Sequence, residues 1–183
     1  MTKWRRDKIG DLCKRITSGG TPKSTNSSYY DNGTIPWLNS KEVNFSRIYS
    51  TEKYITEAGL KESSAKWIDK NSVIVAMYGA TAGQVAIAEI PLTTNQACCN
   101  LTIDESIADY RYIYYCLFFK YSTLSMLANG GAQQNLNAQI IKDFEIFLPE
   151  LPEQKHIADI LSTLDDKIEL NTRINQNLMG CAA

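Results

Sequence analysis

The sequence predicts an α+β fold, with a domain over residues 1–150 and a long helix over residues 151–183. Three observations predict it. Short apolar, β-branched segments bounded by turn residues recur between residues 66 and 103, as expected of buried strands. An aromatic segment of helical length follows them. After two prolines near residue 150, apolar residues recur every three or four positions, which is typical of a separate helix.

The composition is that of an ordinary globular protein, with 183 residues, 44% of them hydrophobic and 21% charged. A chain of this length buries a core without a disulfide or a metal. No apolar run approaches the ~18 residues that span a bilayer, and the charged N-terminus does not resemble a secretion signal. The five cysteines form no CxxC pair, and the single histidine, His156, is far from all of them. We therefore expect a cytoplasmic protein with reduced thiols, no zinc site and no membrane contact.

The first half of the chain predicts a long loop followed by strands. Residues 3–17 carry apolar residues at helical or mixed spacing, which leaves the element type open. Residues 18–37 are rich in Gly, Ser, Thr, Asn and Pro and predict a loop. A loop of that length in a compact domain is more often functional than decorative. Residues 73–77 and 83–90 predict two buried strands on either side of a tight glycine-bounded turn.

The second half predicts the remaining core. Residues 97–103 form a third strand candidate, and residues 110–127 predict a buried helix. The Tyr and Phe side chains of that helix indicate packing rather than a base-stacking platform, because no cations are interleaved with them. After a loop at 129–137, alternating apolar residues at 144–148 predict a closing strand.

The C-terminal helix carries a heptad-like seam. Its positions, spaced alternately by four and three residues, are Ile157, Leu161, Leu164, Ile168, Asn171, Asn175 and Leu178. About three heptads is short, and a helix docked on its own domain shows a similar stripe. The pattern therefore leaves docking and pairing open. The two seam asparagines favour pairing, because a polar seam residue costs stability but fixes register.

The sequence contains no evident catalytic constellation. His156 falls in the first turns of the C-terminal helix, and a Ser-His or Cys-His pair would need that helix to fold back on the domain. The chain lacks a GxxxxGK[ST] phosphate loop, methyltransferase motifs and nuclease-type carboxylate spacing. These absences favour a binding module over an enzyme.

Five loops combine glycines with hydroxyls, amides and lysines, at residues 18–24, 39–44, 78–84, 93–97 and 129–137. Glycines let a backbone approach phosphate, Asn and Gln pair with adenine, and Lys contacts guanine or phosphate. Residues 1–60 hold ten Lys/Arg against six Asp/Glu, which favours a phosphate-facing surface, although the net charge is −1. An ordinary solvated surface has the same composition, so both interpretations stay open at this point.

The chain resembles the specificity subunit of type I restriction-modification systems through an ordered set of segments. These are 17-TSGGTPKS-24, 35-IPWLNSKEV-43, 55-ITEAGLKESSAKWI-68, 72-SVIVAMYGATAGQVAI-87, 94-TNQA-97, 130-GGAQQNLNAQIIKDFEI-146 and 149-PELPEQKHIADILSTLDDKIELN-171. The resemblance implies a target recognition domain over residues 1–150, with a mixed, curved β-sheet and packed helices. It implies a conserved coiled-coil-like spacer or dimerisation helix over residues 151–183.

The resemblance also implies a function and partners. The chain would recognise a specific sequence in double-stranded DNA, without chemistry of its own. A modification (methyltransferase) subunit would methylate adenine N6, and a restriction subunit would join for cleavage. No cofactor is implied for this chain, because S-adenosylmethionine, ATP and Mg²⁺ would belong to those partners. Family members usually hold two recognition domains, so this chain looks like a half-subunit, natural or truncated, which allows a homodimer through the C-terminal helix.

Residues carried over onto the DNA-facing loops are Thr21, Lys23, Lys41, Gly79, Thr81, Gln84, Asn95, Gln133, Gln134 and Asn135. The rival interpretation is a protein-interaction scaffold with a pairing helix, which would need no set of glycine and amide loops. The salt dependence of binding distinguishes the two interpretations, because affinity for DNA falls steeply as the salt concentration rises.

Overall fold

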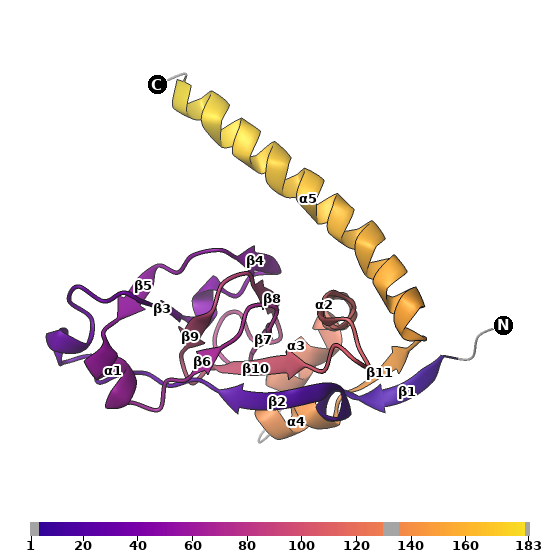
Figure 1. Cartoon of the computed structure of the whole chain (residues 1–183), viewed down its shortest axis with the longest axis horizontal. Coiled ribbons are helices and arrows are strands. Elements are labelled where there is room, and N and C mark those ends of the chain that lie inside the picture. Colours follow the sequence, from indigo (N-terminus) through magenta and orange to yellow (C-terminus); the bar gives the residue numbers. More distant parts are fainter. Residues whose placement is uncertain (1–3, 130–135, 182–183) are drawn as a thin grey trace.

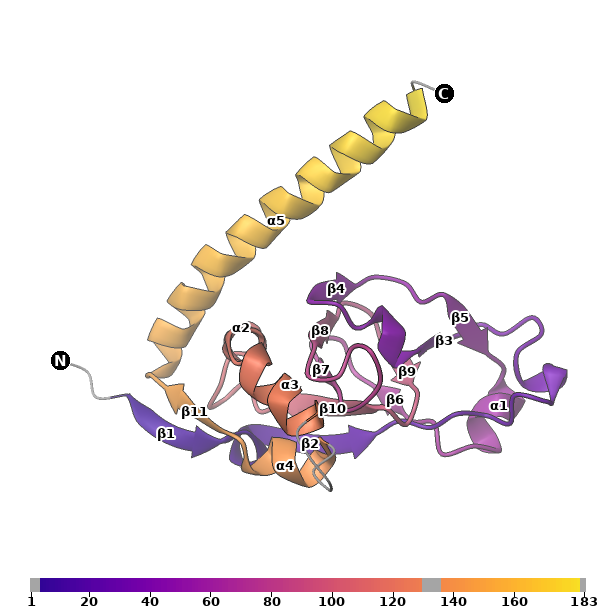
Figure 2. The ribbon, with the colours of Figure 1, turned by 180° about the vertical axis from the view of Figure 1, so that it is seen from behind.

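A computed structural model of the chain describes residues 4–129 and 136–181. Two mixed, curved sheets and a two-stranded ribbon form the body, and one long helix leaves it at the end where the ribbon lies (Figure 1). The opposite view shows the same arrangement, with the helix running back above the domain (Figure 2). The predicted α+β class and mixed sheet are confirmed.

The larger sheet has the strand order β2-β10-β7-β8-β4, antiparallel except for the parallel β4–β8 pair. Its strands are β2 (Cys13–Ser18), β10 (Cys98–Ile103), β7 (Val73–Ala76), β8 (Val85–Ala88) and β4 (Ser46–Ile48). Every residue of β7 and β8 is buried. One face of this strand pair packs on the core that includes α2, and the other packs on the core of the smaller sheet. Burial on both faces explains why these strands read as continuous apolar runs.

The smaller sheet has the strand order β5-β3-β9-β6. Its strands are β5 (Lys53–Ile55), β3 (Ile35–Leu38), β9 (Leu92–Thr94) and β6 (Trp67–Ile68). The ribbon pairs β1 (Arg5–Lys8) with β11 (Glu145–Leu148). The short helices are α1 (Glu57–Lys61), η1 (Ile9–Leu12), η2 (Ser27–Tyr29) and η3 (Ser40–Glu42). Strands of two to four residues are too short to show alternation in a sequence, so this sheet was not predicted.

The single helix predicted over 110–127 is wrong in its extent. The structure has α2 (Tyr110–Phe119) and α3 (Tyr121–Asn129), separated at Lys120. Asp109 caps the start of α2 through two backbone amides. The break lets Leu124 reach full burial, while Phe119 remains 84% exposed. Residues that precede the predicted closing strand form α4 (Ala138–Asp143), and the strand itself is β11.

The long helix α5 spans Leu151–Cys181 and is anchored at its base. The buried side chain of Gln154 accepts a hydrogen bond from the Asp109 amide at 3.0 Å and donates one to the Pro149 carbonyl at 2.9 Å. Ala158 is fully buried in the main core. Because the first turns of α5 share that core, the division of the chain into domains at residue 150 stays a prediction.

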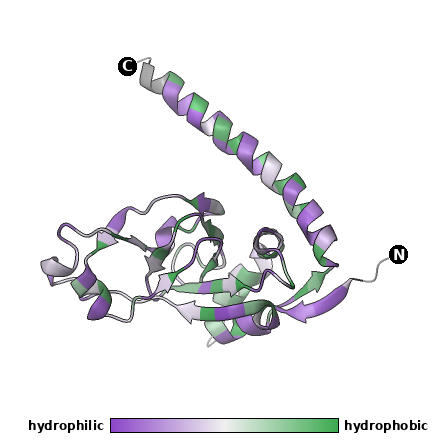
Figure 3. Ribbon diagram, viewed as in Figure 1, coloured by the Kyte–Doolittle hydropathy of each residue, from purple (hydrophilic) through white to green (hydrophobic). Residues whose placement is uncertain are grey.

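The predicted seam of α5 changes its environment along the helix. Ile157 and Leu161 are half-buried, whereas Leu164 and Ile168 are 52% and 62% exposed. Asn171, Asn175 and Leu178 are also exposed. Hydrophobic and hydrophilic residues alternate along the helix where it rises away from the domain (Figure 3). The helix therefore docks at its base and presents an exposed apolar face above it.

Within the described residues, no helix combines the length and apolar character needed to cross a membrane. Nor do residues 4–129 and 136–181 bring together three or more His, Cys, Asp or Glu side chains that could hold a metal ion.

Candidate nucleic-acid interface

Four of the five polar loops meet and are joined by hydrogen bonds. The Gly20 amide donates to the Thr94 carbonyl at 2.8 Å, and the Asn95 amide donates to the Leu38 carbonyl at 2.9 Å. The Thr21 hydroxyl is hydrogen-bonded to the Gln96 side chain. Together with the hydrogen bond from Thr81 to Ser40, these contacts assemble residues 19–24, 39–43, 78–84 and 94–97 into what we call the four-loop surface.

Ser40, in η3, lies at the centre of the four-loop surface. Its carbonyl accepts a hydrogen bond from the Thr81 hydroxyl at 2.7 Å, and its hydroxyl accepts one from Asn95 Nδ2 at 3.5 Å. Asn95 is 7% exposed, and its Oδ1 accepts the Ala97 amide at 3.2 Å. Thr81 and Asn95, both predicted to lie at DNA, are thus engaged in holding the loops together. Sequence reasoning missed Ser40, whose only signal was its place in a polar loop.

Glycines allow these loops to approach one another. A Cβ atom on Gly19 would lie 2.1 Å from the Thr94 carbonyl oxygen, and one on Gly20 would lie 2.3 Å from the Ala65 nitrogen. No side chain fits at those distances, so the chain requires glycine at both positions. Neither residue was predicted as a site residue.

The turn between β7 and β8 requires glycine for its backbone. Gly79 and Gly83 have positive φ angles of 90° and 85°, where other residues are strained. Among the residues that the structure describes, nothing lies within 4 Å of the position of a Cβ on Gly79, so this predicted residue leaves its backbone open to a ligand. Gly83 instead packs on α3, where a Cβ would lie 2.8 Å from the Ser125 nitrogen. Gly83 thereby places the turn beside the helix that leads into residues 130–135.

Gln84, another predicted residue, has an unsatisfied acceptor. Its side-chain oxygen is buried and has no hydrogen-bond partner within the part of the chain that the structure describes. A buried acceptor without a donor costs about 1–3 kcal/mol. The exposed ring of Tyr78 lies on the same turn, and the sequence analysis did not single it out as a site residue.

The two predicted lysines differ in their surroundings. Lys41 forms an ion pair with Glu52 at 2.5 Å. The hydrogen bond to Glu52 and the charge of that carboxylate raise the pKa of Lys41 above its ordinary value. Lys23 is exposed in the loop after β2, on the same segment as Thr21. Lys23 is therefore the better placed of the two for a phosphate, because Glu52 already offsets the charge of Lys41.

A cleft of about 520 Å³ adjoins the four-loop surface. Its lining includes Thr21, Tyr30, Trp37, Lys53 and Tyr54. The Trp37 indole donates a hydrogen bond to the Gly20 carbonyl at 2.9 Å. This bond connects the wall of the cleft to Gly20, one of the two glycines at which the loops approach closely. The cleft offers ring faces beside polar groups, a combination that suits a planar ligand group.

The amide loop at 129–137 is described only in part. Gln133, Gln134 and Asn135, the residues expected to read bases, lie outside the described residues. Asn137 caps α4, and its side-chain oxygen accepts the amides of Gln139 and Ile140 at 2.9 and 3.0 Å. That amide therefore has a local structural role.

Cys13, Cys99 and Cys116, among the cysteines that the structure describes, give no sign of nucleophilic chemistry. Burial raises the pKa of Cys13 and of Cys99 to about 12, and that of Cys116 to about 11. These thiols are therefore protonated at neutral pH, where a nucleophile would need the thiolate. His156 is exposed on α5.

The fold and the four-loop surface define a binding domain that carries a helical arm. The chain belongs to the family of type I restriction modification DNA specificity domains, whose sequence model matches residues 1–179.

Two relatives and one solved structure place the chain within this family. It is 35% identical to the specificity subunit of the type I restriction enzyme MjaIX of Methanocaldococcus jannaschii, over 96% of this chain and 41% of that protein. It is 30% identical to the EcoR124I/EcoR124II specificity subunit of Escherichia coli, over 86% of this chain and 40% of that protein. The crystal structure of the S subunit from M. genitalium matches 92% of this chain and 40% of that one, with a TM-score of 0.67 at 23% identity. That structure shares the fold. The chain thus spans about two-fifths of the length of these relatives.

Proposed function

We propose that this chain recognises a specific DNA sequence on behalf of a type I restriction-modification complex. The observation that carries the proposal is the convergence of four glycine- and amide-bearing loops on one surface, in a chain of this family. Glycines allow close approach to phosphates, and side-chain amides recognise base edges in the major groove. A protein-interaction scaffold would not need such a surface.

The residues of the surface divide into two proposed roles. Thr81 and Asn95 position the loops, because their polar groups are already bonded to Ser40. Gln84 and the amides of residues 133–135 are proposed to read bases, and Gly79 to admit a phosphate close to the backbone. Lys23 is proposed to bind a phosphate. Lys41 would bind a phosphate only if its ion pair with Glu52 were broken.

The chain is proposed to act without chemistry of its own. A methyltransferase subunit and a restriction subunit would modify and cleave the DNA, and S-adenosylmethionine, ATP and Mg²⁺ would bind to those subunits. The exposed apolar face of α5 is proposed to pair with the same face of a second copy, or of a second such helix. Pairing would bring together two recognition domains.

The proposal predicts that the chain binds DNA well only together with its modification subunit. A net charge of −1 gives little general attraction for phosphates, so the chain alone is expected to bind weakly. A gel-shift titration at fixed salt, with and without the modification subunit, measures the difference. Equal affinity in the two titrations would contradict this expectation, and no sequence preference in either would contradict the proposed function.

Phosphate contacts and base contacts should respond differently to substitution. Lys23→Ala is expected to weaken binding to all sequences alike and to lower the slope of log affinity against log salt by about 0.9. Gln133→Ala or Asn135→Ala is expected to cost about 1–3 kcal/mol on the target and to relax specificity at one base pair. Measuring the affinity for target DNA and for scrambled DNA at salt concentrations from about 50 to about 200 mM distinguishes phosphate contacts from base contacts. Unchanged sequence preference in both amide variants would make 129–137 an ordinary polar loop.

A further inference from the structure

The contacts between the domain and α5 change from apolar to polar along the helix. The hydrophobic core includes α5 only as far as Ala158, in its second turn. Above that point Leu161 is half-buried, and the hydrogen bonds and ion pairs between helix and domain come from charged and hydroxyl groups. Arg111 Nη1 donates to Asp159 at 2.7 Å, and Tyr115 donates its hydroxyl hydrogen to Asp165 at 2.7 Å.

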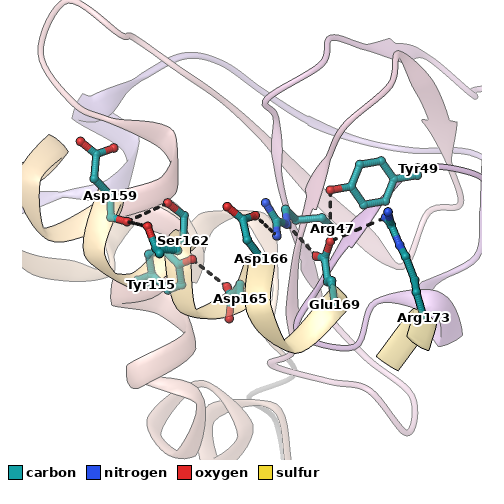
Figure 4. A network of polar contacts seen from close by, with 10 residues as sticks. Arg47, Tyr49, Tyr115, Asp159, Ser162, Asp165, Asp166, Glu169 and Arg173 are labelled. Atoms are coloured by element: carbon teal, nitrogen blue, oxygen red, sulfur yellow. Dashed lines mark hydrogen bonds and ion pairs between the residues drawn. The ribbon is translucent and has the colours of Figure 1, made fainter. Parts of the chain in front are cut away.

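Arg47 forms two ion pairs with α5 above these contacts. Its Nη2 donates to Asp166 at 2.6 Å, and its Nε donates to Glu169 at 2.7 Å (Figure 4). We call Arg47, Tyr115, Asp165, Asp166 and Glu169 the clasp. The Arg47 side chain is only 17% exposed, whereas the side chains of Asp166 and Glu169 are 63% and 31% exposed. One guanidinium thus spans successive turns of α5, and a planar fork of donors suits that task.

The position of Arg47 is set from within the domain. Arg47 lies on β4, the edge strand that pairs in parallel with β8. Two residues earlier, Phe45 has a φ angle of 50°, in the left-handed region that non-glycine residues rarely adopt. Its ring stacks on Phe118 at 4.5 Å and meets Tyr121 edge-on at 4.9 Å. The aromatic contacts hold a strained backbone that turns the chain into β4.

The space beside the clasp, between α5 and the domain, is polar. A cavity of about 220 Å³ lies there, and its lining includes Arg47, Arg111, Tyr115 and Asp166. Apolar close packing therefore does not fix the helix at this level, and the ion pairs of the clasp do.

We infer that the clasp fixes the angle at which α5 leaves the domain, and that Arg47 is thereby a positioning residue for the gap between two DNA half-sites. The role of Arg47 in setting the gap rests on the proposed function. From Ala158 to Leu178 the helix rises about 30 Å, so a tilt of about 10° displaces its far end by about 5 Å. Base pairs are spaced by about 3.4 Å, so such a tilt shifts one domain by more than one base pair.

The first experiment measures the angle in the full chain without DNA. The variant Asp166→Asn with Glu169→Gln removes the charges that Arg47 holds, at positions where neither side chain is in the core. The control Glu150→Gln with Glu153→Gln removes the same charge at the base of the helix. Fluorophores introduced as unnatural amino acids at Lys61 and Asn175, with excess unlabelled chain, report the distance between the domain and the arm. Both positions are exposed.

We expect the distance distribution to broaden or shift by several ångströms in the clasp variant and to match wild type in the control. Arg47→Lys, which keeps the charge but lacks the fork, is expected to give an intermediate width. Raising the salt concentration should broaden the wild-type distribution towards that of the clasp variant, because screening weakens exposed ion pairs. Circular dichroism confirms that each variant is folded. A clasp variant with the wild-type distribution would overturn the inference.

The second experiment measures the consequence for DNA, with the modification subunit present. Targets that carry two half-sites separated by gaps of different length are methylated in one mixture and sequenced. The clasp variant is expected to shift or widen the accepted gap by at least one base pair, with the bases of each half-site unchanged. If the clasp variant changed the distance between the domain and the arm but not the accepted gap, the role of Arg47 in spacing the half-sites would be overturned. A wild-type chain that directs no methylation would overturn the proposed function, and the distance measurement would still decide the role of the clasp.

Discussion

Replacing both Leu164 and Ile168 with aspartate is expected to give a folded monomer that has lost specific binding to a two-site target. Both side chains are more than half exposed on α5, so the substitution removes nothing from the core. In two paired copies, four apolar side chains would be lost from the contact. At about 1.5 kcal/mol or more each, the loss is about 6 kcal/mol, enough to abolish a dimer of ordinary affinity.

The loss of DNA binding would follow from the loss of pairing. Each recognition domain alone would contact one half-site, and the gain from two linked sites would disappear. Sedimentation velocity measures the association, circular dichroism the fold, and a gel shift the binding. The control is Thr163→Asp with Thr172→Asp, which adds the same charge at exposed polar positions of the same helix. A dimeric Leu164→Asp, Ile168→Asp variant, or a wild type that is monomeric at tens of micromolar, would contradict the pairing of two copies through this face.

Gly20→Ala is expected to separate two of the four loops and to remove most of the sequence preference. A Cβ on this residue would lie 2.3 Å from backbone atoms of Ser64 and Ala65, so the segment 19–24 must move away. That movement breaks the Gly20–Thr94 bond and the hydrogen bond from Trp37 to the Gly20 carbonyl. Overpacking of this kind costs about 1–3 kcal/mol of stability.

The control for Gly20→Ala must carry a similar clash elsewhere. Gly59 in α1 is suitable, because a Cβ there would lie 2.7 Å from the Tyr29 carbonyl oxygen and outside the four-loop surface. Urea denaturation measures the stability of both variants, and DNA affinity is then compared per folded molecule. We expect Gly59→Ala to keep the sequence preference. If Gly20→Ala keeps it as well, the convergence of the loops is not what recognises the DNA.

The sequence alone identified elements whose pattern is local. The apolar segments that became β7, β8 and β10 are continuous because both faces of the central strands are buried. The spacing of three and four residues predicted α5, since a helix repeats about every 3.6 residues. The ordered motifs predicted the family, which the match over residues 1–179 confirms.

The aromatic helix shows where local pattern was insufficient. Apolar residues continue from 110 to 127 without a glycine or proline to mark an end, so the sequence predicted one buried helix. The structure breaks it at Lys120. The ring of Phe45, more than 70 residues earlier in the sequence, packs on Phe118 and Tyr121 on either side of that break. A contact of that kind leaves no periodic signal.

The tertiary structure also decided which polar residues are free to bind. Thr81 and Asn95 looked like ligand contacts in sequence, yet both hold Ser40. Lys41 looked like a phosphate contact, yet Glu52 pairs with it. Arg47 gave no signal at all, and its partner Asp166 lies 119 residues away. The sequence determines strands and helices because their periodicity depends on near neighbours. The partners of a polar side chain depend on which distant segments the fold brings within about 3 Å, and only the tertiary structure decides that.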